Sequence, residues 1–429
     1  MWPGSLYTVY EIPTLLREVS VMTSKSRVAL TAVAVCALAT TAACGSKGSS
    51  GSGTDADTLT LGASLSLTGA LAREGQLTKE GYQLCQQKVN DAGGVDVGGK
   101  KLKLAIKYQD DTSIPDVAAQ LADQFNDQGI KLILSSYGSA NVEAQAAVIE
   151  RNGQVMADSA GADNAIFTKG YTRTFAVLSP ATEYAASIVK AIDELASPKP
   201  KTIAFLSADD GFSVTGAEGG AATAEDLGYE VLPTEYFPAG STDVSSALTQ
   251  IKGQQPDVII GTVHVEEGVA IVKQSKELGV TPDGFGETVA PPTPDFAKAL
   301  GDSANGVLGS SQWTDTTIGE DKYFGTAKDY AADIQKEFGH TPDYHDAEAS
   351  AACLALVLAV EDAGTTDADA VRDSLAGLDT ESFFGKIKFD ETGQNIYKPM
   401  SVIQIQDGQV VAVWPKEVAE ADMIWPGTK

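Results

Sequence analysis

The sequence is short of the side chains from which most catalytic and metal sites are built. Its 429 residues include only three histidines, His264, His340 and His345. The last two, in "HTPDYH", stand five positions apart and lack the i, i+4 spacing of a helical zinc pair, so we interpret the histidines as surface or structural residues. No G-x-x-x-x-G-K-[ST] phosphate loop or G-x-S-x-G nucleophile motif occurs, and no G-x-G-x-x-G follows the first predicted strand. These absences leave few candidate catalytic or metal-binding residues, and we expect neither a metal nor a cofactor.

Positive charge is scarce as well. The chain has 31 lysines and arginines against 58 aspartates and glutamates, which gives a formal net charge of −27 at pH 7. This excess argues against nucleic acid and anionic lipid surfaces as partners, because both would repel the protein. A hydrophobic content of 43% allows a full globular core. The length favours two domains, since a typical domain has roughly 100–200 residues.

The N-terminal region lacks an apolar run long enough to cross a bilayer, which needs roughly 20 residues. Instead, Lys25 and Arg27 precede a short apolar run at 28–39, and small residues follow in "TTAACGS". A basic start, a short apolar run and small residues before a cut site are typical of an export signal. We expect the cut between Ala43 and Cys44.

Cysteine directly after two alanines resembles the lipobox of bacterial lipoproteins, in which the thiol takes a diacylglycerol. Thr41 departs from that pattern, which usually has an aliphatic residue there. The resemblance implies lipidation of Cys44 and anchoring to the outer face of the cell membrane; a soluble secreted protein is the alternative. Residues 1–43 would be the leader, with its signal starting at Met22 and residues 1–21 arising from an upstream mis-start.

Cysteine is otherwise rare, and only Cys85 and Cys353 lie beyond the lipidation site. Each stands on the apolar side of a predicted helix, in "EGYQLCQQKVNDAGG" and "AEASAACLALVLAV". Export permits a disulfide, but buried free cysteines are common, and we expect free thiols.

After a flexible tether at 44–57, rich in glycine and serine, strand-like and helix-like runs alternate. "TLTLGASLSL" and "KLKLAIKYQDD" indicate strands, and "DVAAQLADQFNDQG" places Val117, Leu121 and Phe125 on one helical face. This alternation implies parallel sheets with right-handed crossovers. A second series from "KTIAFLSADDG" predicts a second lobe. The β-rich tail, with "MSVIQIQDGQVVAVWP", predicts that the chain crosses back between the lobes before it ends.

One loop has the features of an anion site. In "KLILSSYGSANVEAQAAVIE", Gly138 and Ser139 would leave backbone N–H groups at a helix N-terminus, where the dipole favours an anion. A carboxylate fits better than a phosphate because no lysine is near. The alternative is that Ser139 or Asn141 simply caps the helix. The loop at 159–162 follows the next strand and would emerge at the same sheet edge, where ligands bind in open α/β folds.

Several motifs follow one another along the chain in the order found in a known family. They are "GASLSLTGALAREG", "SSYGSANVEAQ", "KELGVTPDGF", "PDYHDAEASAA" and "FFGKIKFDETGQN". From about Leu59 to the C-terminus they resemble the type I periplasmic binding proteins, and especially the branched-chain or hydrophobic amino acid receptors of ABC importers. The resemblance implies two Rossmann-like α/β lobes with parallel sheets, joined by a three-stranded hinge. Lobe 1 would comprise residues 58–178 and 312–400, and lobe 2 residues 179–311 and 401–429.

The resemblance also implies that two loops of lobe 1 hold the ligand carboxylate. The first is the loop of Gly138 and Ser139, and it is helped by the loop of Ala160, Gly161 and Ala162. Tyr137, beside Gly138, is a further predicted ligand contact. The family's amino acid binders often place a threonine hydroxyl where Ala162 stands, a departure that weakens the case for an ordinary leucine-like ligand.

From lobe 2, the resemblance assigns an aromatic contact to Phe212 and the grip on a ligand ammonium to Glu287. His264 occupies the place of a tyrosine of the family. Tyr344 and Trp313 are further candidate aromatics of the cleft, although Trp313 fits core packing equally well.

Arg73, in "GALAREG", follows the first strand and would pair with a ligand carboxylate, unless it is a solvated surface arginine. We expect binding without reaction. The ligand would be a small carboxylate, above all a branched-chain or other hydrophobic amino acid, which a monomeric protein would deliver to the permease subunits of an ABC importer. If Glu287 points away from the cleft, an amine-free aromatic or aliphatic acid becomes the better ligand. A ligand-sensing surface receptor without transport is the other alternative.

Overall fold

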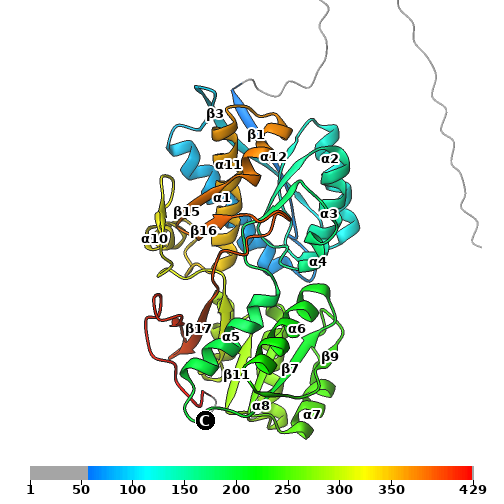
Figure 1. The fold of residues 1–429 in the computed structure, drawn as a ribbon, viewed down its shortest axis with the longest axis vertical. Coiled ribbons are helices and arrows are strands. Elements are labelled where there is room, and N and C mark those ends of the chain that lie inside the picture. The colour runs from blue at the N-terminus through cyan, green and yellow to red at the C-terminus, as the bar shows by residue number, and fades with distance from the viewer. Residues whose placement is uncertain (1–56, 428–429) are drawn as a thin grey trace, which may run out of the picture. The chain divides into compact units, whose positions relative to one another are not determined.

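The computed structural model describes residues 57–427. The predicted export signal, its start at Met22, the lipid site Cys44 and all but the last residue of the tether lie outside the described residues. The described chain contains two large sheets, each with its own set of helices (Figure 1).

The first sheet has six strands in the order β2-β3-β1-β4-β5-β6. Its strands are β1 (Thr58–Leu65), β2 (Val95–Val97), β3 (Lys100–Asp110), β4 (Leu132–Leu134), β5 (Val155–Asp158) and β6 (Thr174–Ala176). All neighbours are parallel except β2 and β3. Parallel neighbours need crossover connections, which here contain α1 (Ala72–Asp91), α2 (Pro115–Asp127) and α3 (Ser139–Asn152). The predicted apolar face of α2 is confirmed, because Phe125 is fully buried and Leu121 almost so.

The second sheet has the order β18-β17-β12-β11-β10-β7-β8, and β9 also pairs with β7. Its strands are β7 (Thr202–Ala208), β8 (Glu230–Val231), β9 (Glu235–Phe237), β10 (Val258–Thr262), β11 (Gly284–Glu287), β12 (Leu308–Ser311), β17 (Ser401–Gln406) and β18 (Gln409–Trp414). Its helices are α5 (Thr182–Leu195), α6 (Gly211–Asp226), α7 (Ser245–Gln254), α8 (Val265–Leu278) and α9 (Pro294–Leu300). A short 3₁₀ turn, η1 (Gly301–Ala304), follows α9.

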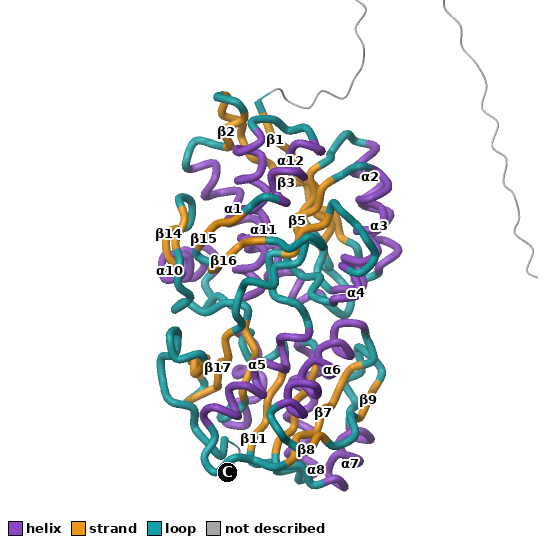
Figure 2. The backbone as a smooth tube through the Cα atoms, viewed as in Figure 1, coloured by secondary structure: helices purple, strands orange, loops and turns teal. Residues whose placement is uncertain are grey.

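The chain passes between the two sheets after β6, after β12 and before β17. Figure 2 shows the loops that join the two parts of the described chain. The segment between the last two passages adds to the first sheet's side the elements β13 (Glu320–Asp321), β14 (Gly325–Thr326), α10 (Ala327–Phe338), α11 (Tyr344–Ala363), α12 (Ala368–Ala376), β15 (Asp379–Ser382) and β16 (Gly385–Lys388). The predicted return of the tail is confirmed, since β17 pairs antiparallel with β12. We call the first sheet with α1–α3, α4 (Asn164–Phe167) and α10–α12 lobe 1, and the second sheet with α5–α9 lobe 2.

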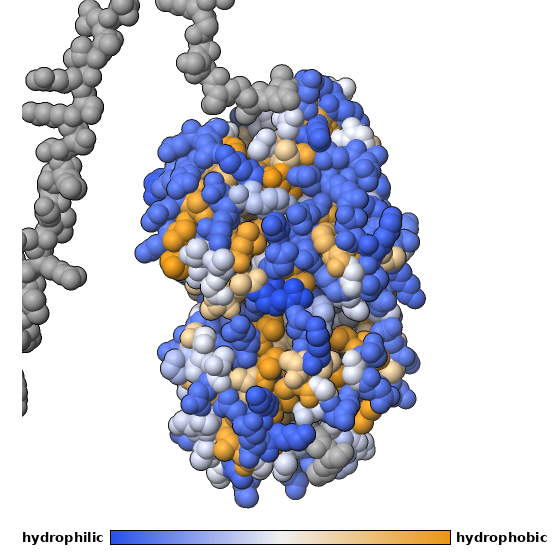
Figure 3. All heavy atoms as spheres, turned by 180° about the vertical axis from the view of Figure 1, so that it is seen from behind, coloured by the Kyte–Doolittle hydropathy of each residue, from blue (hydrophilic) through white to orange (hydrophobic). Residues whose placement is uncertain are grey.

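Helix α11 is the central helix of lobe 1, because it is buried at nearly every position and packs against α1. Within residues 57–427 no single helix is long and apolar enough to cross a membrane; α11 and α12 meet that test only as a pair bent by 111°. A helix that is apolar on all sides is typical of a protein core. Hydrophilic residues cover most of the molecular face drawn in Figure 3, in keeping with the acidic composition.

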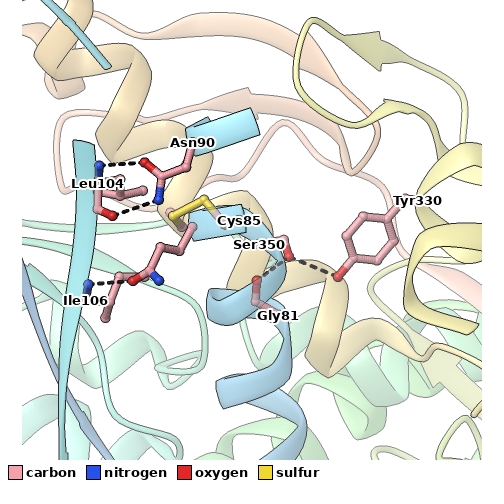
Figure 4. The surroundings of a disulfide bond; sticks show 9 residues. Gly81, Cys85, Asn90, Leu104, Ile106, Tyr330 and Ser350 are labelled. Atoms are coloured by element: carbon pink, nitrogen blue, oxygen red, sulfur yellow. Dashed lines mark hydrogen bonds between the residues drawn. A yellow bond between two sulfur atoms is a disulfide. The ribbon is translucent and has the colours of Figure 1, made fainter. Parts of the chain in front are cut away.

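A disulfide between Cys85 and Cys353 joins α1 to α11, so the expectation of free thiols is wrong (Figure 4). Both cysteines are fully buried, and their Cα atoms are 6.3 Å apart, within the range that a disulfide spans. The two helices approach closely at Gly81, where an added Cβ would lie 2.2 Å from the carbonyl oxygen of Asp346. The hydroxyl of Ser350 donates to the carbonyl of Gly81 at 2.7 Å. Sequence periodicity places each cysteine on an apolar face but does not reveal that the two faces meet.

Candidate functional site

A cavity between the two lobes brings together most of the predicted site residues. The predicted residues that line it are Tyr137, Gly138, Ser139, Ala160, Ala162, Phe212, His264 and Tyr344. The lining residues that were not predicted are Leu178, Tyr184, Val289 and Glu348. A wider groove adjoins the cavity, and the two share Gly138, Ser139 and His264. The ligand contacts assigned to these residues stay predictions.

The N-terminus of α3 lies at the junction of cavity and groove. Gly138 precedes the helix with φ of 91°, a left-handed conformation that favours glycine, and an added Cβ would lie 2.8 Å from Leu71 Cδ1. No side chain caps the helix, so neither Ser139 nor Asn141 has the predicted capping role. Asn141 Nδ2 instead donates to the carbonyl of Tyr137 at 3.0 Å. Within the described residues, the first amides of α3 therefore have no acceptor, so they are available to a ligand, and the predicted anion site there stays a prediction.

The second predicted loop is only partly available to a ligand. Asp158 Oδ1 accepts hydrogen bonds from the backbone amides of Ala160 and Gly161, at 2.9 and 2.8 Å. Gly161 does not line the cavity, which corrects its predicted position; an added Cβ there would clash with Val142 and Asp158. Burial raises the pKa of Asp158 to about 6, although the two amides act to lower it. The loop therefore contributes small apolar walls from Ala160 and Ala162, and of its amides only that of Ala162 has no acceptor among the described residues.

Aromatic rings form the remaining walls. The rings of Tyr184 and Phe212 meet edge to face with centroids 5.1 Å apart, and Phe212 lies 5.4 Å from the His264 ring. Tyr344 stacks on His345, with centroids 4.1 Å apart. His345 itself is fully buried. Faces and edges of this kind suit an apolar or aromatic ligand group.

His264 and Asp210, both in lobe 2, form an ion pair that lines the groove. The distance between His264 Nε2 and Asp210 Oδ2 is 3.7 Å. Burial acts to lower the pKa of His264, but the nearby carboxylate of Asp210 outweighs it and raises that pKa to about 9. Burial likewise acts to raise the pKa of Asp210, yet His264 and Ser213 bring it down to about 2. His264 is therefore a cation at neutral pH, and its Nδ1 has no partner among the described residues.

Glu348 is the acidic group of the cavity, and the sequence reasoning missed it. It lies on α11, one turn after Tyr344, with only 1% of its surface exposed. Its Oε2 accepts no hydrogen bond from any described residue. Burial, together with the charges of Asp343 and Asp158, raises the pKa of Glu348 well above its ordinary value. The available signal was a single acid in the otherwise apolar run "AEASAACLALVLAV".

Glu287 does not line the cavity, which corrects the position expected for it. Its carboxyl group lies inside lobe 2, where a Cβ added to Gly268 would lie 2.5 Å from Glu287 Oε2. Neither carboxyl oxygen has a hydrogen-bond partner among the described residues, and burial raises the pKa of Glu287 well above its ordinary value. The side chain leaves the end of β11 toward the first turn of α8.

Arg73 and Trp313 also lie outside the cavity. Arg73 pairs through Nε with Asp295, so its charge is already matched. Trp313 is almost fully buried, and its indole Nε1 donates to the carbonyl of Phe383 at 3.0 Å. Of the two roles expected for Trp313, the structure therefore supports packing in the core over a place in the cleft.

Three polar contacts between described residues bridge the lobes around the cavity. Arg73 of α1 pairs with Asp295 of α9, as described above. The amide of Val265 at the start of α8 donates to Glu74 Oε1 at 3.3 Å. Further, Thr215 Oγ1 of α6 donates to Asp163 Oδ1 at 2.9 Å. These contacts hold the lobes together, so the cavity is enclosed by both.

Comparison with known proteins gives matches along most of the chain. A family model described as periplasmic binding protein matches residues 58–409. The Leu/Ile/Val-binding protein homolog 7 of Brucella melitensis is 24% identical over 384 residues, which cover 85% of this chain and 94% of that protein.

Two solved structures have a similar fold. The branched-chain amino acid transporter substrate binding protein of Streptococcus pneumoniae, in complex with isoleucine, has a TM-score of 0.72 at 21% identity and covers 86% of this chain and 100% of its own. A solute binding protein of an ABC transporter from Rhodopseudomonas palustris, in complex with 3,4-dihydroxy benzoic acid, has a TM-score of 0.71 at 20% identity, with coverages of 86% and 98%. One fold thus accommodates ligands with and without an amine.

Proposed function

Because the chain belongs to the periplasmic binding protein family, we propose that it captures a small hydrophobic amino acid, branched-chain or similar, in the cavity between its lobes. The observation that carries this proposal is the pairing of an uncapped helix N-terminus with an unpartnered carboxyl group in one apolar cavity. The amides that begin α3 bind the ligand carboxylate. The aromatic rings and small side chains of the walls cover its apolar part.

Glu348 receives the ligand ammonium in this proposal, in place of Glu287. An ammonium buried without a partner would be costly, and Glu348 is the acid that lines the cavity. Because the pKa of Glu348 is raised, its carboxyl group favours the protonated form in the empty cavity. Binding of an ammonium favours loss of that proton, since an ionised carboxylate is the better partner. The position of Glu287 inside lobe 2 removes the original reason for an amine, and Glu348 supplies a new one.

An amine-free acid is the second candidate. The Rhodopseudomonas palustris neighbour binds 3,4-dihydroxy benzoic acid, and the cavity of this chain has the aromatic walls that would pack against such a ring. A neutral Glu348 would then donate a hydrogen bond to a ligand hydroxyl, which its raised pKa favours.

The same proposal covers transport. Capture by a two-lobed protein, with closure of the lobes over the ligand, suits delivery to the membrane permease of an ABC importer, and we propose binding without turnover. Lipidation at Cys44 would keep a monomeric protein next to that permease. A surface receptor that senses the ligand is the alternative, and adjacent genes for permeases and ATPases would separate the two.

The test compares leucine with 4-methylpentanoate, which lacks only the amine. We expect wild-type protein to bind leucine in isothermal titration calorimetry. Glu348→Gln should weaken leucine binding by roughly 10- to 150-fold, the cost of losing a hydrogen bond to a charged group. It should leave binding of 4-methylpentanoate unchanged.

Glu287→Gln is the matched control, because it removes an equally buried acid outside the cavity. It should leave both affinities unchanged if the variant folds as the wild type does. Equal weakening of both ligands by Glu348→Gln would refute its assigned role. Binding of 4-methylpentanoate or 3,4-dihydroxybenzoate with no binding of any amino acid would select the second candidate.

A further inference from the structure

Three side chains of different elements converge in lobe 1, apart from the cavity. Glu80 lies on α1, His340 on the loop between α10 and α11, and Asp346 on the first turn of α11. Each offers one ligand atom, and these atoms all lie within 4.8 Å of one another. The side chains of Glu80 and His340 retain 13% and 19% exposure, so the cluster is accessible from solvent.

The imidazole of His340 is oriented as a metal ligand would be. Its Nδ1 lies 2.9 Å from the carbonyl oxygen of Thr341, which can only accept, so Nδ1 carries a proton. Its Nε2 is paired with Glu80 Oε2 at 2.7 Å, so a metal ion bound there would take the place of the Nε2 proton. Metal-bound histidines typically donate their second ring N–H to a backbone carbonyl or a carboxylate, which fixes the tautomer and leaves the other nitrogen to bind.

Asp346 supplies an independent sign that a cation fits here. Its side chain is fully buried, and Oδ2 accepts from the amide of Asp343 at 3.2 Å. Oδ1 has no partner among the described residues, nor has Oδ2 of the neighbouring Asp343. Buried carboxylates without a cation are costly. The three acids of this region, Glu80, Asp343 and Asp346, outnumber the two histidines in contact with them, since His340 contacts Glu80 and His345 contacts Asp343.

The scaffold holds these groups in place without a ligand. Helices α1 and α11 touch at Gly81, next to Glu80, and Ser350 of α11 donates to the Gly81 carbonyl (Figure 4). The disulfide at Cys85 ties the same two helices one turn further along α1. Ligands on tied helices are preorganised, which favours metal affinity.

We propose that Glu80, His340 and Asp346 form a zinc site. One imidazole nitrogen and two carboxylates are a ligand set that Zn²⁺ accepts, with water as the fourth ligand. Mg²⁺ and Ca²⁺ prefer oxygen ligands alone, so they fit this set less well. The histidine spacing that argued against a zinc pair in the sequence does not apply, because the ligands come from separate elements and His345 takes no part. The site is independent of the amino acid cavity.

The test is titration of the full chain, purified without an affinity tag, with ZnCl₂ in the absence of any amino acid. We expect one Zn²⁺ per chain by isothermal titration calorimetry. X-ray absorption at the zinc edge should show one imidazole among oxygen ligands. His340→Gln and Asp346→Asn should each weaken binding at least about tenfold. Asp346→Asn keeps an acceptor for the Asp343 amide, and His340→Gln changes a partly exposed loop residue, so the two variants test the site through different parts of the fold.

Asp123→Asn is the control, because this substitution removes the same charge as Asp346→Asn. Asp123 is an exposed acid of lobe 1 that pairs with Arg151. The control variant should bind zinc as the wild type does. Three results would overturn the proposal: no zinc binding by the wild type, binding that both variants retain, or stronger binding of Mg²⁺ or Ca²⁺ than of Zn²⁺. The first would mean that Glu80 and His340 form a plain ion pair beside a protonated Asp346.

Discussion

The disulfide between α1 and α11 should be a major source of stability for lobe 1. Cys85 and Cys353 are 268 positions apart, so the bond closes a very long loop of the unfolded chain. The chain-entropy relation gives about 5.6 kcal/mol for a loop of 268 residues. With an unfolding entropy of about 2.1 cal/mol/K per residue over roughly 370 described residues, reduction should lower the melting temperature by about 7 °C.

Differential scanning calorimetry of oxidised and reduced wild-type protein measures this directly. Because both cysteines are buried, the protein should be reduced in denaturant and refolded with thiol present. Alkylation and mass spectrometry then report the state of both thiols. Reduced wild type keeps both sulfur atoms, whereas the double variant Cys85→Ala/Cys353→Ala also loses their packing, so the variant should melt slightly lower still. Equal melting temperatures of oxidised and fully reduced wild type would refute the reasoning, since loop closure would then contribute nothing.

Three further predictions concern the groove and cavity. The folded-state pKa of His264 is raised to about 9, so the stability from its pair with Asp210 is complete below about pH 6.5 and is lost as the pH rises through 9. The pKa of His340, paired with Glu80, is also raised to about 9 and adds a decline of its own. In urea melts from pH 6 to 10, His264→Gln should therefore make the decline smaller than in the wild type, and an unchanged decline would contradict the role of His264. Arg73→Ala removes an ion pair between the lobes, with Asp295, whose side chains are 32% and 43% exposed. Such exposed pairs contribute little, so the leucine affinity measured by calorimetry should fall by no more than about fivefold. A larger loss would indicate that Arg73 contacts the ligand directly. Ser139→Ala should weaken leucine binding less than about tenfold, because the amides of α3 remain; complete loss would contradict their role.

The fold class could be predicted from the sequence, and it is confirmed. Apolar runs that end in small or acidic residues mark the parallel strands, since both faces of such sheets are buried. The periodic helices between them fix the crossovers. The loop at Gly138 was located for the same reason, because a strand, a glycine and a helix in succession define its local geometry.

Residues brought together from distant parts of the chain could not be predicted in the same way. Arg73 meets Asp295 across 222 positions, and neither residue has a local pattern that announces the other. Glu348 stands in a helix that is buried on every side, so periodicity cannot tell which neighbour it faces. The disulfide partners were recognised as buried, but burial alone does not measure their separation.

The bare start of α3 has a practical consequence for protein engineering. The groups that we propose to hold an anion are main-chain amides, so replacing the surrounding side chains leaves them in place. A library for a fluorescent biosensor of other organic acids should therefore keep residues 138–141 and randomise wall positions such as Tyr184, Phe212 and Glu348. Gly138 is the position to leave untouched, because any larger residue would strain the turn from which those groups project.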